Sequence, residues 1–317
     1  MSTIVITGGT GLTGRAITYE LLKKGHQVIV LTRKLPETPF LNNLKYALWD
    51  IKKQLIDISA IQEADYIIHL AGAGVVEKKW TTAYKAEILN SRTQSSRLLV
   101  DTLKNNTNKV KALISASAIG WYGADAIDDN NRPGGFTETD PPDTNFLSET
   151  CRLWEESLNP VIDLGKRLVK YRLGIVLSNE GGALAEFKKP LRFRIAAILG
   201  NGKQIVSWIH IDDLVKIFIT AIENETLNGV YNAVAPDPVT NKKLTVSLAT
   251  AMWKKFFIPL HVPIFILKIM MGQRSIEVLK STRVSCQKLL GTGFAFTYPN
   301  IEKAVAGLIS AKKKIRS

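Results

Sequence analysis

The chain has 317 residues and a formal net charge of +14, with 45% hydrophobic and 22% charged residues. This composition is typical of a globular protein and argues against a disordered chain, a collagen-like repeat or a coiled coil. The charge is uneven, because residues 241–317 carry 14 basic and two acidic side chains, whereas residues 1–240 are nearly balanced.

The first part of the chain alternates short apolar strands with amphipathic helices. Strands are predicted over 4–6, 28–31, 44–48, 66–70 and 112–114, and helices over 12–24 and 81–103. Buried-looking strands that alternate with helices predict right-handed βαβ units around a parallel sheet. The expected fold is therefore α/β, a doubly wound parallel sheet of the Rossmann type.

The second part of the chain is less regular. Residues 123–145 are rich in Gly, Pro and Asp, which predicts a loop. A helix over 146–164, a strand through 168–177 and a helix near 211–223 are expected to follow. After the turn-rich segment 235–238 the chain becomes basic and mostly helical. We therefore expect a Rossmann domain with inserted substrate-side segments in residues 1–239, and a smaller helical substrate-side module in residues 240–317.

The sequence carries no sign of export, membrane insertion or a metal site. The N-terminus leads directly into an apolar strand pattern, without a basic region or a cleavage site, so no secretory signal is expected. The longest apolar run, 256–271, contains Pro259, Pro263 and Lys268, and falls short of the roughly 18 uninterrupted apolar residues of a spanning helix. Two cysteines and four scattered histidines predict neither a disulfide framework nor a metal site. A cytoplasmic protein is expected.

A glycine-rich turn follows the first predicted strand. Residues 8–14 satisfy both Gly-x-x-Gly-x-x-Gly and Gly-x-Gly-x-x-Gly, between a strand and a helix as the motif requires. Glycine allows a tight turn and a close approach to a pyrophosphate, and the helix N-terminus offers free N–H groups. The alternative is a glycine-rich turn without a ligand. The predicted cofactor contacts in this turn are Gly8, Thr10, Gly11, Leu12 and Gly14.

The end of the second strand indicates which dinucleotide is bound. An NAD site would place Asp or Glu there to hold the ribose 2′-hydroxyl, but this sequence has Thr32, Arg33 and Lys34. Two cations could clamp a 2′-phosphate, and Arg33 could make a forked contact. We therefore expect all three residues to contact the cofactor and NADP(H) to be preferred over NAD(H). The alternative is that Arg33 and Lys34 are solvated loop charges.

The glycine-rich turn and five further motifs together resemble one known family. They are ITGGTGLTG at 6–14, HLAGAG at 69–74, SASAIGWYG at 115–123, SWIHIDDL at 207–214, GVYN at 229–232 and APDPVTN at 235–241. Through these motifs nearly the whole chain resembles the extended short-chain dehydrogenase/reductases, in particular the YfcH-like epimerases with a C-terminal domain of unknown function. The resemblance implies further cofactor contacts at Asp50 and Ile51 beside the adenine, and at Leu70, Ala71, Gly72, Ala73 and Ser115.

The chain departs from this family resemblance at the usual catalytic pair. Extended short-chain dehydrogenases normally use Tyr-x-x-x-Lys on one helix, where the Lys lowers the pKa of the Tyr and holds the nicotinamide ribose. With Glu155 as the anchor, the equivalent helix has Leu147 at the Tyr position and Cys151 at the Lys position. Neither side chain can take over these roles, and the YfcH-like family shares the loss.

Ser117 and Tyr122 are the candidate catalytic replacements. Ser117 ends a central strand, where such folds place a hydroxyl that bonds a substrate carbonyl; a serine there can equally cap a turn. Tyr122 is the nearest candidate acid, although an aromatic residue at such a turn more often packs in the core. Cys151, beside Arg152, is either a reactive thiolate or an inert buried cysteine.

Tryptophans that gather around the substrate cleft would indicate a flat or ring-shaped substrate. The alternative is that these tryptophans are scattered through the hydrophobic core and have no role in binding. The expected substrate contacts are Trp80, Cys151, Trp154 and Trp208.

Two functional hypotheses follow from these motifs. The first is an NADP(H)-dependent oxidoreductase or epimerase that acts on a small carbonyl or nucleotide-sugar-like substrate. The alternative is a non-catalytic module that senses NADP(H). Nucleic-acid or membrane-surface binding is less favoured, because the aromatics of the basic last quarter are not interleaved with its cations. The sequence is also compatible with a homodimer.

Overall fold

A parallel sheet forms the centre of the molecule in this computed structural model, which describes residues 1–36, 42–125 and 134–314, with only the backbone of 311–314. Residues 126–133 of the predicted loop lie outside the described residues. In the described chain the main sheet contains β1 Thr3–Thr7, β2 Gln27–Thr32, β3 Leu44–Asp50, β4 Leu55–Ile56, β5 Tyr66–His69, β6 Ala112–Ala118, β7 Arg167–Leu173 and β12 Gly229–Ala233.

The strand order confirms the expected doubly wound fold. The sheet runs β12-β7-β6-β5-β1-β2-β3-β4, and all neighbours are parallel except the edge pair β3 and β4. The chain reverses direction across the sheet between β1 and β5, which is where such folds bind ligands at the carboxyl ends of the strands. The central strands are apolar on both faces, as Ile4, Val5 and Ile6 illustrate, since all three are fully buried.

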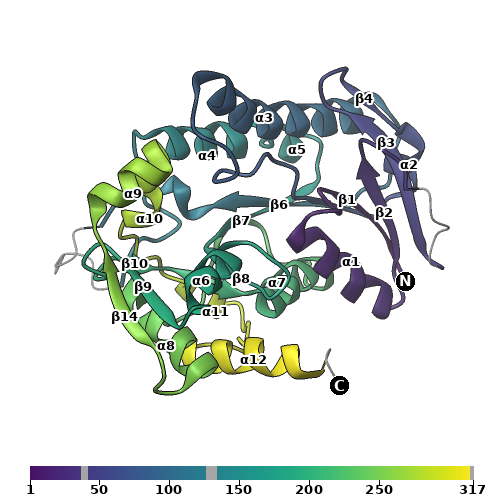
Figure 1. The fold of residues 1–317 in the computed structure, drawn as a ribbon. Helices are drawn as coiled ribbons and strands as arrows, with labels where there is room; N and C mark the ends of the chain where they lie inside the picture. Colours follow the sequence, from purple (N-terminus) through teal and green to yellow (C-terminus); the bar gives the residue numbers. More distant parts are fainter. Residues whose placement is uncertain (37–41, 126–133, 315–317) are drawn as a thin grey trace.

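Helices cover both faces of the sheet. Figure 1 shows one face covered by α3 Thr82–Asn105, α4 Phe146–Ser157 and α5 Pro160–Asp163, and the other by α1 Leu12–Lys23 and α7 Ile211–Glu223. The short α2 Ile58–Glu63 follows β4. Within the described ranges, every helix is too short or too polar to cross a bilayer.

Two elements expected as single pieces are each divided in the structure. The helix expected over 146–164 ends at Ser157, and a separate turn of helix begins at Pro160, which lacks the N–H that would continue the first helix. The strand expected over 168–177 breaks at Gly174, where a Cβ would lie 2.8 Å from the Ser207 oxygen. Beyond this close approach β8 Ile175–Leu177 leaves the sheet and pairs with β11 Trp208–His210.

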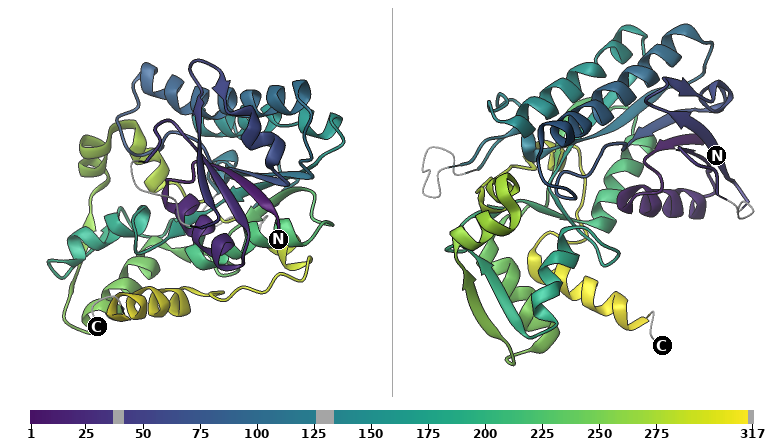
Figure 2. Two further views of the ribbon diagram at one scale, coloured as in Figure 1. Left: turned by 90° about the vertical axis from the view of Figure 1, so that its right-hand side faces the viewer. Right: turned by 45° about the horizontal axis from the view of Figure 1, so that its top comes forward.

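A second group of elements lies at one end of the molecule (Figure 2). Its strands are β9 Ile195–Leu199, β10 Ile205–Val206, β13 Val239–Thr240 and β14 Ile258–Val262, in the pairs β9–β14 and β10–β13. Its helices are α6 Ala183–Leu191, α8 Asn241–Trp253, α9 Ile264–Met271, α10 Ser275–Leu279 and α12 Ile301–Lys314. The short α11 Gln287–Leu290 packs instead against β12 of the main sheet.

This second group has its own apolar cluster, which includes Leu184 and Trp208 as well as Leu244 and Leu308. The predicted boundary between residues 239 and 240 falls inside β13, and residues from both sides of it share this cluster. The division into two domains therefore stays a prediction.

Candidate functional site

The glycine turn packs directly against the segment that follows β5. Gly8 has φ of +68°, and a Cβ there would lie 2.9 Å from the carbonyl carbon of Leu70. A Cβ on Gly14 would lie 2.3 Å from the Gly8 oxygen, so only glycine lets α1 start this close to β1. Two segments predicted to contact the cofactor, 8–14 and 70–73, therefore lie side by side at the carboxyl ends of the strands.

The N-terminus of α1 fits the phosphates of a dinucleotide. Its N-cap residue is Gly11, which provides no side-chain capping bond, and the first turn contains no acidic residue. The first backbone N–H groups of this helix therefore lack the side-chain acceptor that usually satisfies them, and they carry the positive end of the helix dipole. Thr10 is exposed beside them, and Leu12 begins the helix.

A buried hydroxyl–imidazole chain fixes the segment after β5. Thr7 Oγ1 accepts the backbone N–H groups of Leu70 at 3.1 Å and Ala71 at 3.2 Å. Its own proton then points to His69 Nδ1, 2.7 Å away, which leaves His69 Nε2 to donate to Ser96 Oγ at 3.2 Å. Burial lowers the pKa of His69 to about 3, so the ring is neutral, as this arrangement requires.

The two cations predicted to select NADP(H) are exposed at the end of β2. The hydroxyl of Thr32 donates to the Lys34 oxygen at 3.0 Å and accepts from the Lys34 N–H at 3.4 Å, which makes a tight turn. Among the described residues, neither Arg33 nor Lys34 forms an ion pair. The Asp50 carboxylate accepts from two backbone N–H groups of its own turn, and Ile51 packs half-buried on the core.

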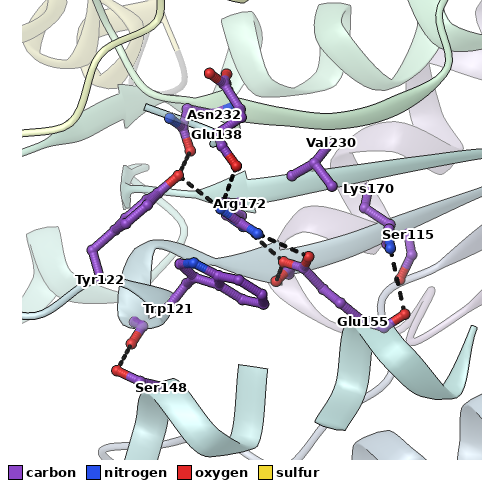
Figure 3. Close-up of polar contacts among 12 residues, drawn as sticks. Ser115, Trp121, Tyr122, Glu138, Ser148, Glu155, Lys170, Arg172, Val230 and Asn232 are labelled. Atoms are coloured by element: carbon purple, nitrogen blue, oxygen red, sulfur yellow. Dashed lines mark hydrogen bonds and ion pairs between the residues drawn. The ribbon is translucent and has the colours of Figure 1, made fainter. Parts of the chain in front are cut away.

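A row of polar side chains crosses three neighbouring strands near their carboxyl ends (Figure 3). Ser117, Arg172 and Asn232 are direct neighbours in the register of β6, β7 and β12. The Ser117 hydroxyl donates to Glu155 Oε1 at 2.7 Å, and Arg172 binds both oxygens of that carboxylate, at 2.9 and 3.1 Å. The Glu155–Arg172 pair is buried, so removal of one partner would cost about 3–5 kcal/mol.

Tyr122 completes this row from the turn after β6. Its phenol donates to Asn232 Oδ1 at 2.7 Å and accepts from Arg172 Nη1 at 2.9 Å. The side chain is fully buried, and burial raises the pKa of Tyr122 to about 12, against the opposing effect of Arg172. Both predicted catalytic hydroxyls, on Ser117 and Tyr122, therefore donate their protons inside the protein.

The positions of the usual Tyr–Lys pair are apolar and buried. Leu147 and Cys151 both pack against Gly120, at the short 3₁₀ turn Ile119–Trp121. Burial raises the pKa of the Cys151 thiol to about 12, while the neighbouring Arg92 opposes this rise. Arg152 instead pairs with Glu149 and Glu156 on its own helix, at 2.6 and 2.7 Å. This environment favours the inert alternative for Cys151.

The structure brings together only some of the tryptophans expected at the substrate. Trp80 meets Phe146 at the start of α4, with ring centroids 5.4 Å apart, and Trp154 of the same helix is buried against His69. Trp208 lies in the second apolar cluster, where its indole N–H donates to the Asp237 oxygen. The substrate role of these residues stays a prediction, as does the cofactor role of the fully buried Ser115.

Three charged residues near the site belong to none of the sequence motifs: Arg92, Glu138 and Arg172. Arg172 had a detectable signal, since an arginine inside an apolar strand pattern needs a buried acidic partner. Glu138 accepts the Asn232 N–H at 2.7 Å from a loop, and no local pattern marks it.

The fold and the glycine turn define a Rossmann-type protein with a nucleotide-binding turn, and comparison with known sequences narrows this class. The profile of the NAD dependent epimerase/dehydratase family matches residues 4–146, and a domain of unknown function, DUF1731, matches residues 262–308. Epimerase family protein SAR0825 from Staphylococcus aureus is 36% identical over 98% of this chain and 100% of its own length. Epimerase family protein YfhF from Bacillus subtilis is 33% identical over 98% of this chain and 99% of its own length.

The chain therefore belongs to the epimerase family within the extended short-chain dehydrogenase/reductases, as its motifs indicated. The structure of human epimerase family protein SDR39U1 with NADPH matches with a TM-score of 0.83 and 26% identity, over 97% of this chain and 99% of that one. UDP-N-acetylglucosamine 4-epimerase from Bacillus cereus matches with a TM-score of 0.75 and 18% identity, over 98% and 99%. The second likeness shows the shared fold alone.

Proposed function

We propose that this protein binds NADP(H) in preference to NAD(H) and acts as an oxidoreductase or epimerase on a small carbonyl or nucleotide-sugar-like substrate. The observation that carries the cofactor proposal is the exposed pair Arg33 and Lys34, which has no ion-pair partner among the described residues. This pair directly follows β2, the strand that comes after α1 in the chain, and the N-terminus of α1 has no side-chain cap. The human relative was solved with NADPH, and the fold is shared with nucleotide-sugar epimerases, which supports the proposal.

In this proposal different residues of the chain bind the cofactor and polarise the substrate. The N-terminus of α1 binds the pyrophosphate, the Thr7–His69 chain holds the segment 70–73 in place, and Arg33 with Lys34 binds the 2′-phosphate. A bound nicotinamide cofactor supplies the hydride chemistry. Ser117 and Tyr122 stay the candidates that polarise the substrate carbonyl. To do so, they must exchange their present bonds to Glu155 and Asn232 for bonds to the substrate.

One observation favours a second candidate function, a non-catalytic module that senses NADP(H). Both candidate hydroxyls already donate their protons within a buried network, and the usual Tyr–Lys pair is replaced by Leu147 and Cys151. A folded site that binds the cofactor without moving a proton would be consistent with this arrangement.

Cofactor titration tests the first part of the proposal. We expect NADPH to bind at least about tenfold more tightly than NADH, because a charged hydrogen bond to one phosphate contributes about 1.5–3 kcal/mol. The double variant R33M/K34M should lose this preference, whereas K104M, which removes an exposed cation of α3, should keep it. Equal affinities in the unaltered protein, or tighter NADH binding, would overturn the NADP(H) assignment.

Turnover assays separate the enzyme from the sensor. Protein and NADPH are incubated with sugar nucleotides, ketones and quinones, and cofactor oxidation and product formation are followed. Turnover that disappears in S117A and Y122F, while both variants unfold cooperatively and bind NADPH, supports the enzyme. Tight NADPH binding without turnover on any substrate of the panel supports the sensor.

A further inference from the structure

Arg92, on α3, carries a positive charge that no carboxylate neutralises within the described part of the chain. Its Nη1 donates to the backbone oxygens of Ala73 at 3.0 Å and Ile88 at 2.8 Å, and its guanidinium lies 5.1 Å from the centre of the Trp154 ring. The side chain is half-buried, and burial lowers the pKa of Arg92. A desolvated cation with only carbonyl and ring partners is costly unless a ligand completes its contacts.

The guanidinium of Arg92 lies directly against the segment predicted to run along the cofactor. A Cβ on Gly72 would lie 3.0 Å from Arg92 Cζ and 3.2 Å from Nη2, so the glycine leaves room for the charged group. The N–H of Ala73 donates to Ser91 Oγ at 2.9 Å, while its oxygen accepts from Arg92. Two neighbouring residues of α3 therefore hold this segment and bring a cation to it.

Arg92 also lies near the position that the lysine of the usual catalytic pair would occupy. Cys151 stands at that position, three residues before Trp154 on α4, and the Arg92 guanidinium lies 5.1 Å from the centre of the Trp154 ring. The charge of Arg92 also opposes the rise in the pKa of the Cys151 thiol that burial causes. A lysine at residue 151 would therefore face Arg92 as a like charge in a desolvated space, which is unfavourable. The neutral Cys151 and the unneutralised Arg92 are consistent with each other for this reason.

We propose that Arg92 supplies from α3 the positive charge that a lysine on α4 usually supplies, and that its guanidinium binds the nicotinamide-ribose half of the dinucleotide. This inference rests on the proposed function, because it requires the protein to bind NADP(H). It assigns Arg92 as a cofactor-binding residue, with Nε and Nη2 as the donors toward the ligand, since Nη1 is used by Ala73 and Ile88.

A fragment of the cofactor tests the location of this contact. The ligand 2′,5′-ADP contains the adenosine and the 2′-phosphate but lacks the nicotinamide ribose. In R92M we expect the dissociation constant of NADPH to rise about 10- to 100-fold, the loss expected for a charged hydrogen bond, while that of 2′,5′-ADP stays unchanged. R92K should restore part of the affinity for NADPH. R97M, which removes an exposed arginine from the same helix, should behave like the unaltered protein.

A pair of substitutions that moves the positive charge from α3 to α4 provides a second, independent test. The single variant C151K should be less stable than the unaltered protein, because it places two cations together. The double variant R92M/C151K should bind NADPH more tightly than R92M alone, because the lysine then supplies the charge from its usual position. If R92M does not fold, R92Q, which keeps a donor but loses the charge, takes its place in both experiments.

Three results would overturn the inference. NADPH affinity that is unchanged in R92M excludes the contact. An equal loss of affinity for NADPH and for 2′,5′-ADP would show that Arg92 only positions segment 70–73. If C151K does not improve NADPH binding in the R92M background, Arg92 does not replace the charge of the usual lysine. If the unaltered protein binds neither ligand, the proposed function itself fails, and that outcome is distinct from these three.

Discussion

Single hydroxyl groups join elements that are distant in the sequence. Thr7 Oγ1 ties the end of β1 to Leu70 and Ala71, and the Ser117 hydroxyl ties β6 to Glu155 of α4. The Thr7–Ala71 and Ser117–Glu155 bonds are buried, so the loss of either would leave a polar group without a partner, at a cost of about 1–3 kcal/mol. The positions of the strand ends therefore depend on a few polar side chains.

The neutral state of His69 predicts a dependence of stability on pH. Burial lowers the pKa of His69 from 6.5 to about 3, so below pH 6.5 the unfolded chain binds a proton that the folded protein does not. The stabilisation from His69 is complete above pH 6.5 and is lost as the pH falls toward 3. In H69N, which has no titrating ring, the free energy of unfolding should fall less steeply, by up to about 1.4 kcal/mol per pH unit.

Urea unfolding at several pH values between about 7 and 5 measures this difference. The buried His210 also has a lowered pKa, mainly because of burial, and it contributes equally to both proteins. Parallel curves for the two proteins would contradict a neutral His69 in the folded state.

The candidate site was predictable where one short segment contains the whole signal. Residues 8–14 and the pair Arg33–Lys34 could be proposed this way, because the turn and the strand end are local, and their cofactor role stays a prediction. The partner of Glu155 could not be predicted, since Arg172 reaches it only through the register of β7 and the rotation of α4. Arg92 gave no signal either, because an arginine in an amphipathic helix is normally solvated.

At the scale of elements, close backbone approach decides where strands and helices begin and end. The β1–α1 unit was predicted to within a residue, because an apolar run, a glycine turn and Gly25 mark its limits locally. The break at Gly174 was not predicted, since it depends on Ser207, which comes from another part of the chain. Local chemistry therefore predicted the parallel sheet, whereas distant contacts set its interruptions.

Gly14 provides a test of the contact between α1 and β1. In G14A the new methyl group would overlap the Gly8 oxygen, at 2.3 Å, so α1 must move away from the turn. We expect a loss of about 1–3 kcal/mol in stability, as for other overpacked sites, and NADPH binding weakened about tenfold or more.

The matched control is G134A, since no other part of the described chain lies within 4 Å of a Cβ at exposed Gly134. NADPH affinity that is the same in G14A as in G134A would show that the turn does not need this close contact.

At the scale of the whole molecule, the chain comes back from the second group of elements to the polar row that Ser117, Arg172 and Asn232 form. The Ser207 hydroxyl donates to the Thr282 oxygen at 2.9 Å and accepts the Val284 N–H at 3.0 Å. The Asn232 amide donates to the Ser285 oxygen at 3.0 Å. Segment 282–285 therefore contributes to the same polar network that holds Tyr122.

The contacts of segment 282–285 with Ser207 and Asn232 predict how a truncated chain behaves. A protein that ends at residue 239 lacks segment 282–285 and exposes the apolar cluster around Leu184 and Trp208. We expect it to lose cooperative unfolding in urea and to be digested rapidly by protease, whereas a chain that ends at residue 310 should unfold cooperatively. Cooperative unfolding of 1–239 would instead support an independent domain there.

The return of segment 282–285 also has a consequence for synthesis. The ribosome synthesises the chain from its N-terminus onward. The strands of the parallel sheet therefore emerge before the residues that hold Asn232 in place. Tyr122 and its partners can therefore reach their final arrangement only late in translation. A nascent chain stalled before residue 282 would carry a formed glycine turn above an unfinished polar network.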